Sequence, residues 1–374
     1  MSQTDIINEL ESQIKRVDTQ SLDISFNELF DMYTSGELDI TPDYQRLFRW
    51  SEGTRSRFIE SLLLQMPVPP IYVIETEEGK YELIDGLQRF SSYLHLRGEL
   101  EAEHLDSPIN KGDLLKLTEC DIVNSLNGLT WNDLPTILQI KLKRTYIRVQ
   151  VVKKTSDNVF KYHMFKRLNT GGEVLSYQQI RNCTIRLLNT RFINYIENLK
   201  EDNNFRTCIA NISETQRLEA FDQELVLRFF ALKNNPDNFS HDVADFFTEY
   251  MEKVTTEDIS FDYEDNQSSF EKTFNILNQT WGDRIFGRLN KSNDDLQSNF
   301  GIYHFESITL GLQSILNKVN ENEPEHINKI KKIILALKQD EEFKKRTTGG
   351  GKNSSGQFKA RIAISEKYFQ QIEF

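Results

Sequence analysis

Apolar residues recur along the chain at helical and strand spacings, and these spacings predict an order of elements. An amphipathic helix is predicted at the N-terminus, with one apolar face formed by Ile6, Ile7, Leu10 and Ile14. A serine and a glutamate three residues apart, Ser25 and Glu28, predict a capping box for a second helix that ends near Gly36. A third helix is predicted over 54–65, where three prolines follow and stop it.

Strand-like runs surround one polar turn. Residues 71–74 and 81–84 are runs of strand-forming residues separated by polar residues with Gly79, which predicts a hairpin. The second run leads directly into Asp85 and Gly86, and helical spacing follows over 88–96. The sequence therefore predicts a strand, a glycine turn and a helix in succession, with backbone N–H groups at the helix N-terminus.

The remaining pattern separates a mixed region from a helical one. Residues 37–40 and 146–152 predict two more strands, and 100–128 are polar and irregular, as expected of an insertion. Helices are predicted to begin at Thr130 and at Ser156 or Asp157, and most of 177–337 has helical spacing.

We therefore predict an α+β fold with a small mixed sheet, followed by a mostly helical domain. The expected domains are an N-terminal helix over 1–20, an α/β unit over 21–190 and a helical unit over 191–374. The 25 phenylalanines and 13 tyrosines indicate aromatic-rich cores.

Composition narrows the class of protein. The net charge of −12 argues against a chain that coats nucleic acid with much of its surface, although it leaves room for a local basic channel. The three cysteines are widely spaced, which is typical of core thiols in a reduced compartment. Because the sequence has neither a signal-like start nor an 18-residue apolar run, we expect a cytoplasmic protein without a membrane segment.

The predicted turn at Asp85–Arg89 carries the strongest candidate chemistry. Gly86 permits a positive φ and close approach of a ligand. The guanidinium of Arg89 can bind phosphate, the amide of Gln88 can orient water or a base edge, and Asp85 can hold a metal or polarise water. The structural alternative is a plain turn in which Asp85 caps the helix and Arg89 pairs with a surface acid.

Two further motifs carry weaker signals. Tyr44-Gln45-Arg46 lies near Trp50, and positive charge gathers there at Arg46, Arg49, Arg55 and Arg57. This combination is typical of a phosphate-binding patch with a stacking partner, and equally of a solvated basic face with a core tryptophan. The 166–172 run places Arg167 and Asn169 before two glycines, which predicts either an anion-binding nest or a helix C-cap.

Together the three motifs resemble the ParB/sulfiredoxin-like domain at the N-terminus of GmrSD-type restriction endonucleases. That family has a YQR loop followed by tryptophan, a DGQQR turn, and an F-x-R-x-N-x-G-G run before a helix. The corresponding residues here are Tyr44–Arg46 with Trp50, Asp85–Arg89, and the 165–172 run. The resemblance covers roughly residues 20–190.

The resemblance implies a module that binds and hydrolyses a nucleoside triphosphate, accompanied by Mg²⁺, in a DNA restriction or anti-phage system. It implies catalytic roles for Asp85, Gln88 and Arg89. It implies nucleotide binding by a second group of residues: Tyr44, Gln45, Arg46, Gly86, Arg167 and Asn169. The implied partners are the nucleotide, DNA and a separately encoded nuclease subunit, and no protein metal ligands are expected.

Two departures from the family pattern leave other functions open. Leu87 stands where the family has its first glutamine, and no nuclease domain of the HNH type is legible around the isolated His304 and His326. A non-catalytic protein that senses DNA or binds a partner through the same pocket is the main alternative. A ParB-like DNA nuclease ranks lower, because the sequence shows no cluster of metal-binding carboxylates.

Overall fold

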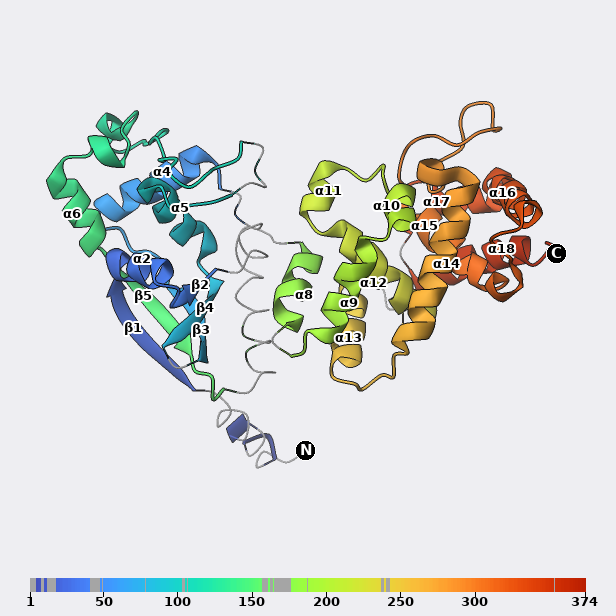
Figure 1. Cartoon of the computed structure of the whole chain (residues 1–374), viewed down its shortest axis with the longest axis horizontal. Helices are drawn as coiled ribbons and strands as arrows, with labels where there is room; N and C mark the ends of the chain where they lie inside the picture. Colours follow the sequence, from blue (N-terminus) through green and yellow to red (C-terminus); the bar gives the residue numbers. More distant parts are fainter. Residues whose placement is uncertain are drawn as a thin grey trace. The chain divides into compact units, whose positions relative to one another are not determined.

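A computed structural model gives the fold of the chain (Figure 1). The structure describes residues 5–7, 10–11, 18–40, 48, 50–77, 79–102, 105, 107–156, 161, 164, 176–186, 188–236, 239, 243–352 and 354–374. Contacts divide the chain into two compact units, Met1–Leu175 and Ser176–Phe374. The predicted α+β fold, with a small mixed sheet followed by a mostly helical part, is confirmed.

The first unit contains five strands and several helices among its described residues. The strands are β1 (Thr19–Ser25), β2 (Leu38–Asp39), β3 (Ile71–Glu77), β4 (Lys80–Asp85) and β5 (Tyr146–Val152). The helices are α2 (Phe26–Thr34), α4 (Glu52–Leu63), α5 (Leu87–Arg97) and α6 (Thr136–Arg144), with short 3₁₀ turns η1 (Asn124–Leu126) and η2 (Trp131–Asp133).

The sheet has the order β1-β5-β3-β4-β2 and mixes both strand directions. β1 is antiparallel to β5 and β3 is antiparallel to β4, whereas β3 with β5 and β2 with β4 run parallel. In β5 the side chains of Ile147, Val149 and Val151 are buried and alternate with more exposed polar ones, so one face of the strand carries the core. Strand β1 was not predicted from the sequence.

Helices α2 and α5 supply much of the core of this unit. Phe26 and Leu29 of α2 and Phe90 and Tyr93 of α5 are all fully buried. The rings of Phe26 and Tyr93 lie 5.0 Å apart, which joins the two helices. The predicted start of α2 is correct in part, because the Ser25 hydroxyl accepts the Glu28 amide, which is one half of a capping box.

The stretch between α5 and α6 is irregular, as predicted, but it packs into the unit. Leu115 and Leu117 are buried within it. The buried carboxylate of Glu60 in α4 accepts the backbone amides of Ile122 and Val123. The helix predicted from Thr130 is a 3₁₀ turn, since Pro135 delays the start of α6 to Thr136.

The second unit is mostly helical over its described residues. Its helices are α8 (Tyr177–Ile185), α9 (Arg191–Lys200), α10 (Asn203–Cys208), α11 (Glu214–Leu218), α12 (Phe221–Asn234), α13 (Val243–Thr255), α14 (Tyr263–Trp281), α15 (Ile302–Gln313), α16 (Pro324–Gln339), α17 (Glu341–Thr347) and α18 (Ser355–Phe369), with 3₁₀ turns η4 (Gly282–Arg284) and η5 (Leu316–Lys318). Nowhere in the described part of the chain is a helix long and apolar enough to cross a membrane.

Aromatic side chains fill the core of the helical unit, as the composition predicted. Phe229 of α12 and Phe270 and Phe274 of α14 are buried, with ring centroids 4.5–6.0 Å apart. Phe274 also stacks on Phe305 of α15 at 6.1 Å. These contacts hold α12, α14 and α15 together mainly by burial of apolar surface.

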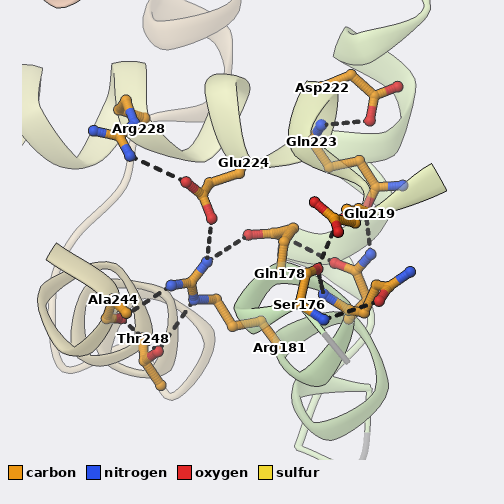
Figure 2. A network of polar contacts seen from close by, with 12 residues as sticks. Ser176, Gln178, Arg181, Glu219, Asp222, Gln223, Glu224, Arg228, Ala244 and Thr248 are labelled. Atoms are coloured by element: carbon orange, nitrogen blue, oxygen red, sulfur yellow. Dashed lines mark hydrogen bonds and ion pairs between the residues drawn. The ribbon is translucent and has the colours of Figure 1, made fainter. Parts of the chain in front are cut away.

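A chain of buried charges also crosses this unit, and Figure 2 shows its first part. Arg181 of α8 donates to Glu224 of α12 at 3.3 Å, and Glu224 accepts from Arg228 at 3.0 Å. Arg181 further donates to Ala244 O and the Thr248 hydroxyl of α13. The network therefore fixes α8 against α12 and α13.

The same network continues to the C-terminal helix. Glu306 of α15 accepts from Arg228 and, at 2.7 Å, from Arg361 of α18. Glu306 is 3% exposed and Arg361 is 1% exposed. Burial by itself would raise the pKa of Glu224, but the guanidiniums of Arg228 and Arg181 lower the pKa below its usual value. Glu224 is therefore held charged by its two arginines.

A buried lysine gives the helical unit a testable pH dependence. Lys338 of α16 donates to the carbonyl oxygens of Ile285 at 2.8 Å and Gly287 at 2.5 Å, and burial lowers its pKa to about 7. The unfolded chain keeps a lysine pKa of about 10.4. Between about pH 7 and 10.4 the lysine is protonated in the unfolded chain but neutral in the folded one, so the unfolding free energy rises with pH. Below about pH 7 the lysine is protonated in both states, and the full cost of burying the ammonium lowers the unfolding free energy.

We therefore expect the unfolding free energy of the wild type, relative to Lys338→Met, to rise by up to about 1.4 kcal/mol per pH unit between pH 7 and 10. Urea unfolding at several pH values measures this difference. The control is Lys329→Met, which removes a partly exposed lysine paired with Glu325 on the same helix. If the difference in unfolding free energy between the wild type and Lys338→Met does not change with pH, like the difference for the control, Lys338 is protonated in the folded protein throughout this range.

Candidate functional site

The predicted turn lies where β4 meets α5. Asp85 is the last residue of β4, and Gly86 is the N-cap of α5 with φ of +105°. A Cβ at Gly86 would come within 2.6 Å of Ile71 Cγ1, at the start of β3. Positive φ and this close packing together require glycine, so the chain can turn sharply from strand to helix only with this residue.

Arg89 binds two groups beside the turn. Its Nη2 lies 2.7 Å from Asp85 Oδ2, and its Nη1 donates to Pro69 O at 2.8 Å. The Arg89 side chain is 12% exposed and that of Asp85 is 31% exposed. A guanidinium has five N–H donors, so these two contacts fix its position while leaving donors that a ligand can meet.

The structural alternative is partly correct and partly wrong. Arg89 does pair with an acid, but the acid is Asp85 of the same turn. Asp85 is not the helix cap, because Gly86 occupies the N-cap, and among the described residues no side-chain hydrogen bond caps α5. The uncapped first turn of α5 presents its partial positive charge beside the Asp85–Arg89 pair.

Gln88 joins this turn to the segment of the first motif. Its Oε1 accepts the backbone amide of Trp50 at 3.1 Å. Trp50 therefore lies next to the turn, although 38 residues separate it from Gln88. The indole of Trp50 packs edge-on against Phe58 at 5.8 Å, which favours the core-anchor interpretation of this tryptophan.

The sequence left open that the arginines near Trp50 form a solvated basic face. Arg55 does not belong to such a face. It is 5% exposed; its Nε donates to Trp50 O at 2.7 Å and its Nη1 lies 2.9 Å from His95 Nδ1. Because arginine only donates, His95 Nδ1 must accept. Arg57 instead forms a surface ion pair with Glu119.

His95 is a neutral support of the site that the sequence analysis missed. Burial, together with the nearby charge of Arg55, lowers the pKa of His95 to about 4. The imidazole therefore stays neutral near pH 7 and orients Arg55, which in turn holds the Trp50 carbonyl. A histidine two turns after Gln88 on the same helix was the available signal, since residues seven apart share a helix face.

Leu87 points into the core, where it is 8% exposed. The departure from the family's glutamine therefore falls on a side chain directed away from solvent. The leucine removes a polar group from the turn, and Asp85 and Arg89 still pair at 2.7 Å.

The other predicted site residues lie outside the described part of the chain. They are Tyr44, Gln45, Arg46, Arg167 and Asn169. Among the described residues no group of three or more histidines, cysteines, aspartates and glutamates could hold a metal ion. Cys120 and Cys208 are buried thiols, as expected for core cysteines.

The geometry thus brings together one carboxylate, one guanidinium and an uncapped helix N-terminus. A helix start and an arginine both attract anions, and the partly exposed Asp85 can accept a proton from, or orient, a water molecule. This set of groups suits an anionic ligand with phosphate groups better than a neutral one.

Comparison with known proteins agrees with the resemblance seen in the motifs. Residues 26–186 match the family model described as GmrSD restriction endonuclease, N-terminal domain. No curated protein and no solved structure matches the chain. The match begins at α2 and extends through α8, so it includes the Asp85–Arg89 turn. Residues 26–186, less than half of the chain, are therefore similar to the N-terminal domain of GmrSD restriction endonucleases.

Proposed function

We propose that the chain binds a nucleoside triphosphate at the Asp85–Arg89 turn and hydrolyses it as part of a restriction or anti-phage system. The observation that carries the proposal is the Asp85–Arg89 pair, held at 2.7 Å beside the uncapped N-terminus of α5. The similarity of residues 26–186 to the GmrSD N-terminal domain supports the defence setting.

In this proposal the first turn of α5 and the remaining donors of Arg89 bind the phosphate oxygens. Asp85 orients the attacking water, and the Asp85–Arg89 contact fixes the distance between water and phosphate. Gln88 and Arg55 are positioning residues, because both hold the Trp50 backbone next to the turn. Mg²⁺ accompanying the nucleotide would neutralise phosphate charge, and Tyr44–Arg46, Arg167 and Asn169 would complete the pocket.

Asp85→Asn is expected to lower phosphate release about a hundredfold, because it removes the carboxylate that orients water while keeping the side-chain size. The measurement is phosphate release from ATP and GTP by the full chain in the presence of Mg²⁺. The matched control is Asp23→Asn, since Asp23 also pairs with an arginine, Arg148, on the exposed face of the sheet.

Asp23→Asn is expected to retain the wild-type rate. Equal rates for Asp85→Asn and the wild type would overturn the catalytic assignment. A preparation whose residual activity is the same in every variant would indicate a contaminating phosphatase, and the assignment would likewise fall.

A second candidate is a non-catalytic sensor that binds nucleotide or DNA through the same turn. It is favoured by the replacement of the family's glutamine with Leu87 and by the existing contacts of Arg89, which resemble those of a structural ion pair. Saturable nucleotide binding by the wild type without phosphate release would select this candidate. Plasmid cleavage lost in Asp85→Asn would instead select the nuclease.

A further inference from the structure

One side of α6 exposes apolar side chains to solvent. Ile137 is 74% exposed and Ile140 is 42% exposed, while Leu142 on the opposite side is fully buried. Arg144 follows at helical spacing on the same side, and Tyr146, 73% exposed, begins β5 directly after the helix. We call Ile137, Ile140, Arg144 and Tyr146 the α6 face.

Positive charge surrounds this face. The last turn of α6 carries Lys141, Lys143 and Arg144, and residues 136–148 contain no acidic residue. In a chain of net charge −12 this is an unusual concentration of one sign. A partner for the α6 face should therefore present apolar side chains flanked by carboxylates.

The N-terminal segment of the chain has that composition. Its described residues, 5–7 and 10–11, are helical, and Ile6, Ile7 and Leu10 are 54–59% exposed. Residues 1–14 contain three acidic residues, Asp5, Glu9 and Glu11, and no lysine or arginine. The helical spacing of apolar residues continues in the sequence to Ile14.

In this structure the segment does not cover the α6 face of its own chain. Ile6, Ile7 and Leu10 are 54–59% exposed, and Ile137 and Tyr146 of the α6 face are 74% and 73% exposed. Both apolar surfaces are exposed in the single chain, so each is available to a second copy.

We propose that the N-terminal segment of one copy binds the α6 face of a second copy, and that the two copies exchange segments reciprocally. Two-fold symmetry then gives two identical contacts. Together these would bury roughly 1,200 Å², the lower end of a specific protein interface. Nucleic acid fits the face less well, because two isoleucines at its centre offer nothing to phosphate.

Sedimentation velocity of the full chain over about 1–100 µM tests this exchange. The wild type should dimerise with increasing concentration. Ile137→Asp and a variant lacking residues 1–14 should each be monomeric, with a dissociation constant raised at least tenfold. Ile122→Asp, which changes another apolar side chain that is 59% exposed, is the control and should dimerise like the wild type.

Mixing Ile137→Asp with the variant that lacks residues 1–14 distinguishes exchange of N-terminal segments from other modes of association. One variant keeps an intact α6 face and the other keeps an intact N-terminal segment, so the mixture should form heterodimers with one of the two contacts. A wild type that is monomeric throughout, a dimer unaffected by Ile137→Asp, or a mixture that stays monomeric would each overturn the proposal. Duplex DNA binding that is lost in Ile137→Asp, without self-association, would assign the face to nucleic acid instead.

Discussion

Glu306→Ala is expected to lower the unfolding free energy of the full chain by about 3–5 kcal/mol. Glu306 accepts from two buried guanidiniums, those of Arg228 and Arg361. Removing it leaves both cations in a low-dielectric interior with fewer partners, and it opens a cavity between α12, α15 and α18. Breaking a buried ion pair from one side costs much more than the intact pair contributes.

Urea unfolding followed by circular dichroism measures this loss. The control is Glu325→Ala, which removes a glutamate from a surface pair with Lys329 and should cost less than about 1 kcal/mol. Glu306→Gln keeps an acceptor for one arginine and should fall between the two. A Glu306→Ala protein as stable as the control would show that water or neighbouring groups satisfy Arg228 and Arg361.

Arg89→Ala is expected to lower kcat/KM for nucleotide hydrolysis about a thousandfold, the size of effect seen for arginines that stabilise transferring phosphate. The change removes the fixed cation at the N-terminus of α5 and leaves the carboxylate of Asp85 without its partner. Repulsion between Asp85 and the phosphates would then add to the lost attraction.

Arg148→Ala is the matched control for this prediction. Arg148 pairs with Asp23 on β1 in the same domain, with both side chains 57% exposed, so its removal changes the net charge equally without touching the turn. Unfolding measured for both variants separates binding from folding, because Arg89 also holds the Pro69 carbonyl. Equal kcat/KM for the two arginine variants would remove Arg89 from the proposed site.

The sequence predicts the local part of this fold well. The hairpin of β3 and β4, helix α5 and strand β5 follow from spacing within single segments. Strand β1 was missed because only two of its seven residues, Leu22 and Ile24, are apolar; its pairing with β5, more than 120 residues away, stabilises it. Long-range pairing leaves little trace in a single segment.

In the candidate site, too, the sequence predicts local contacts but not long-range ones. Asp85, Gly86 and Arg89 meet because they are close in sequence, so the motif alone indicated them. Pro69, whose carbonyl binds Arg89, is 20 residues away, and Trp50, whose amide binds Gln88, is 38 residues away. The sequence does not reveal that either residue contacts the turn. The buried network of Arg181, Glu224, Glu306 and Arg361 likewise depends on helix packing across 43 to 78 residues, which spacing does not reveal.

A crystal structure of the full chain with a non-hydrolysable nucleoside triphosphate and Mg²⁺ tests the central claim most directly. The account predicts phosphate oxygens within hydrogen-bond distance of Arg89 and of the first backbone amides of α5, with Asp85 beside the terminal phosphate. A nucleotide bound elsewhere on the chain, with the Asp85–Arg89 pair unchanged and out of contact with it, would contradict the account.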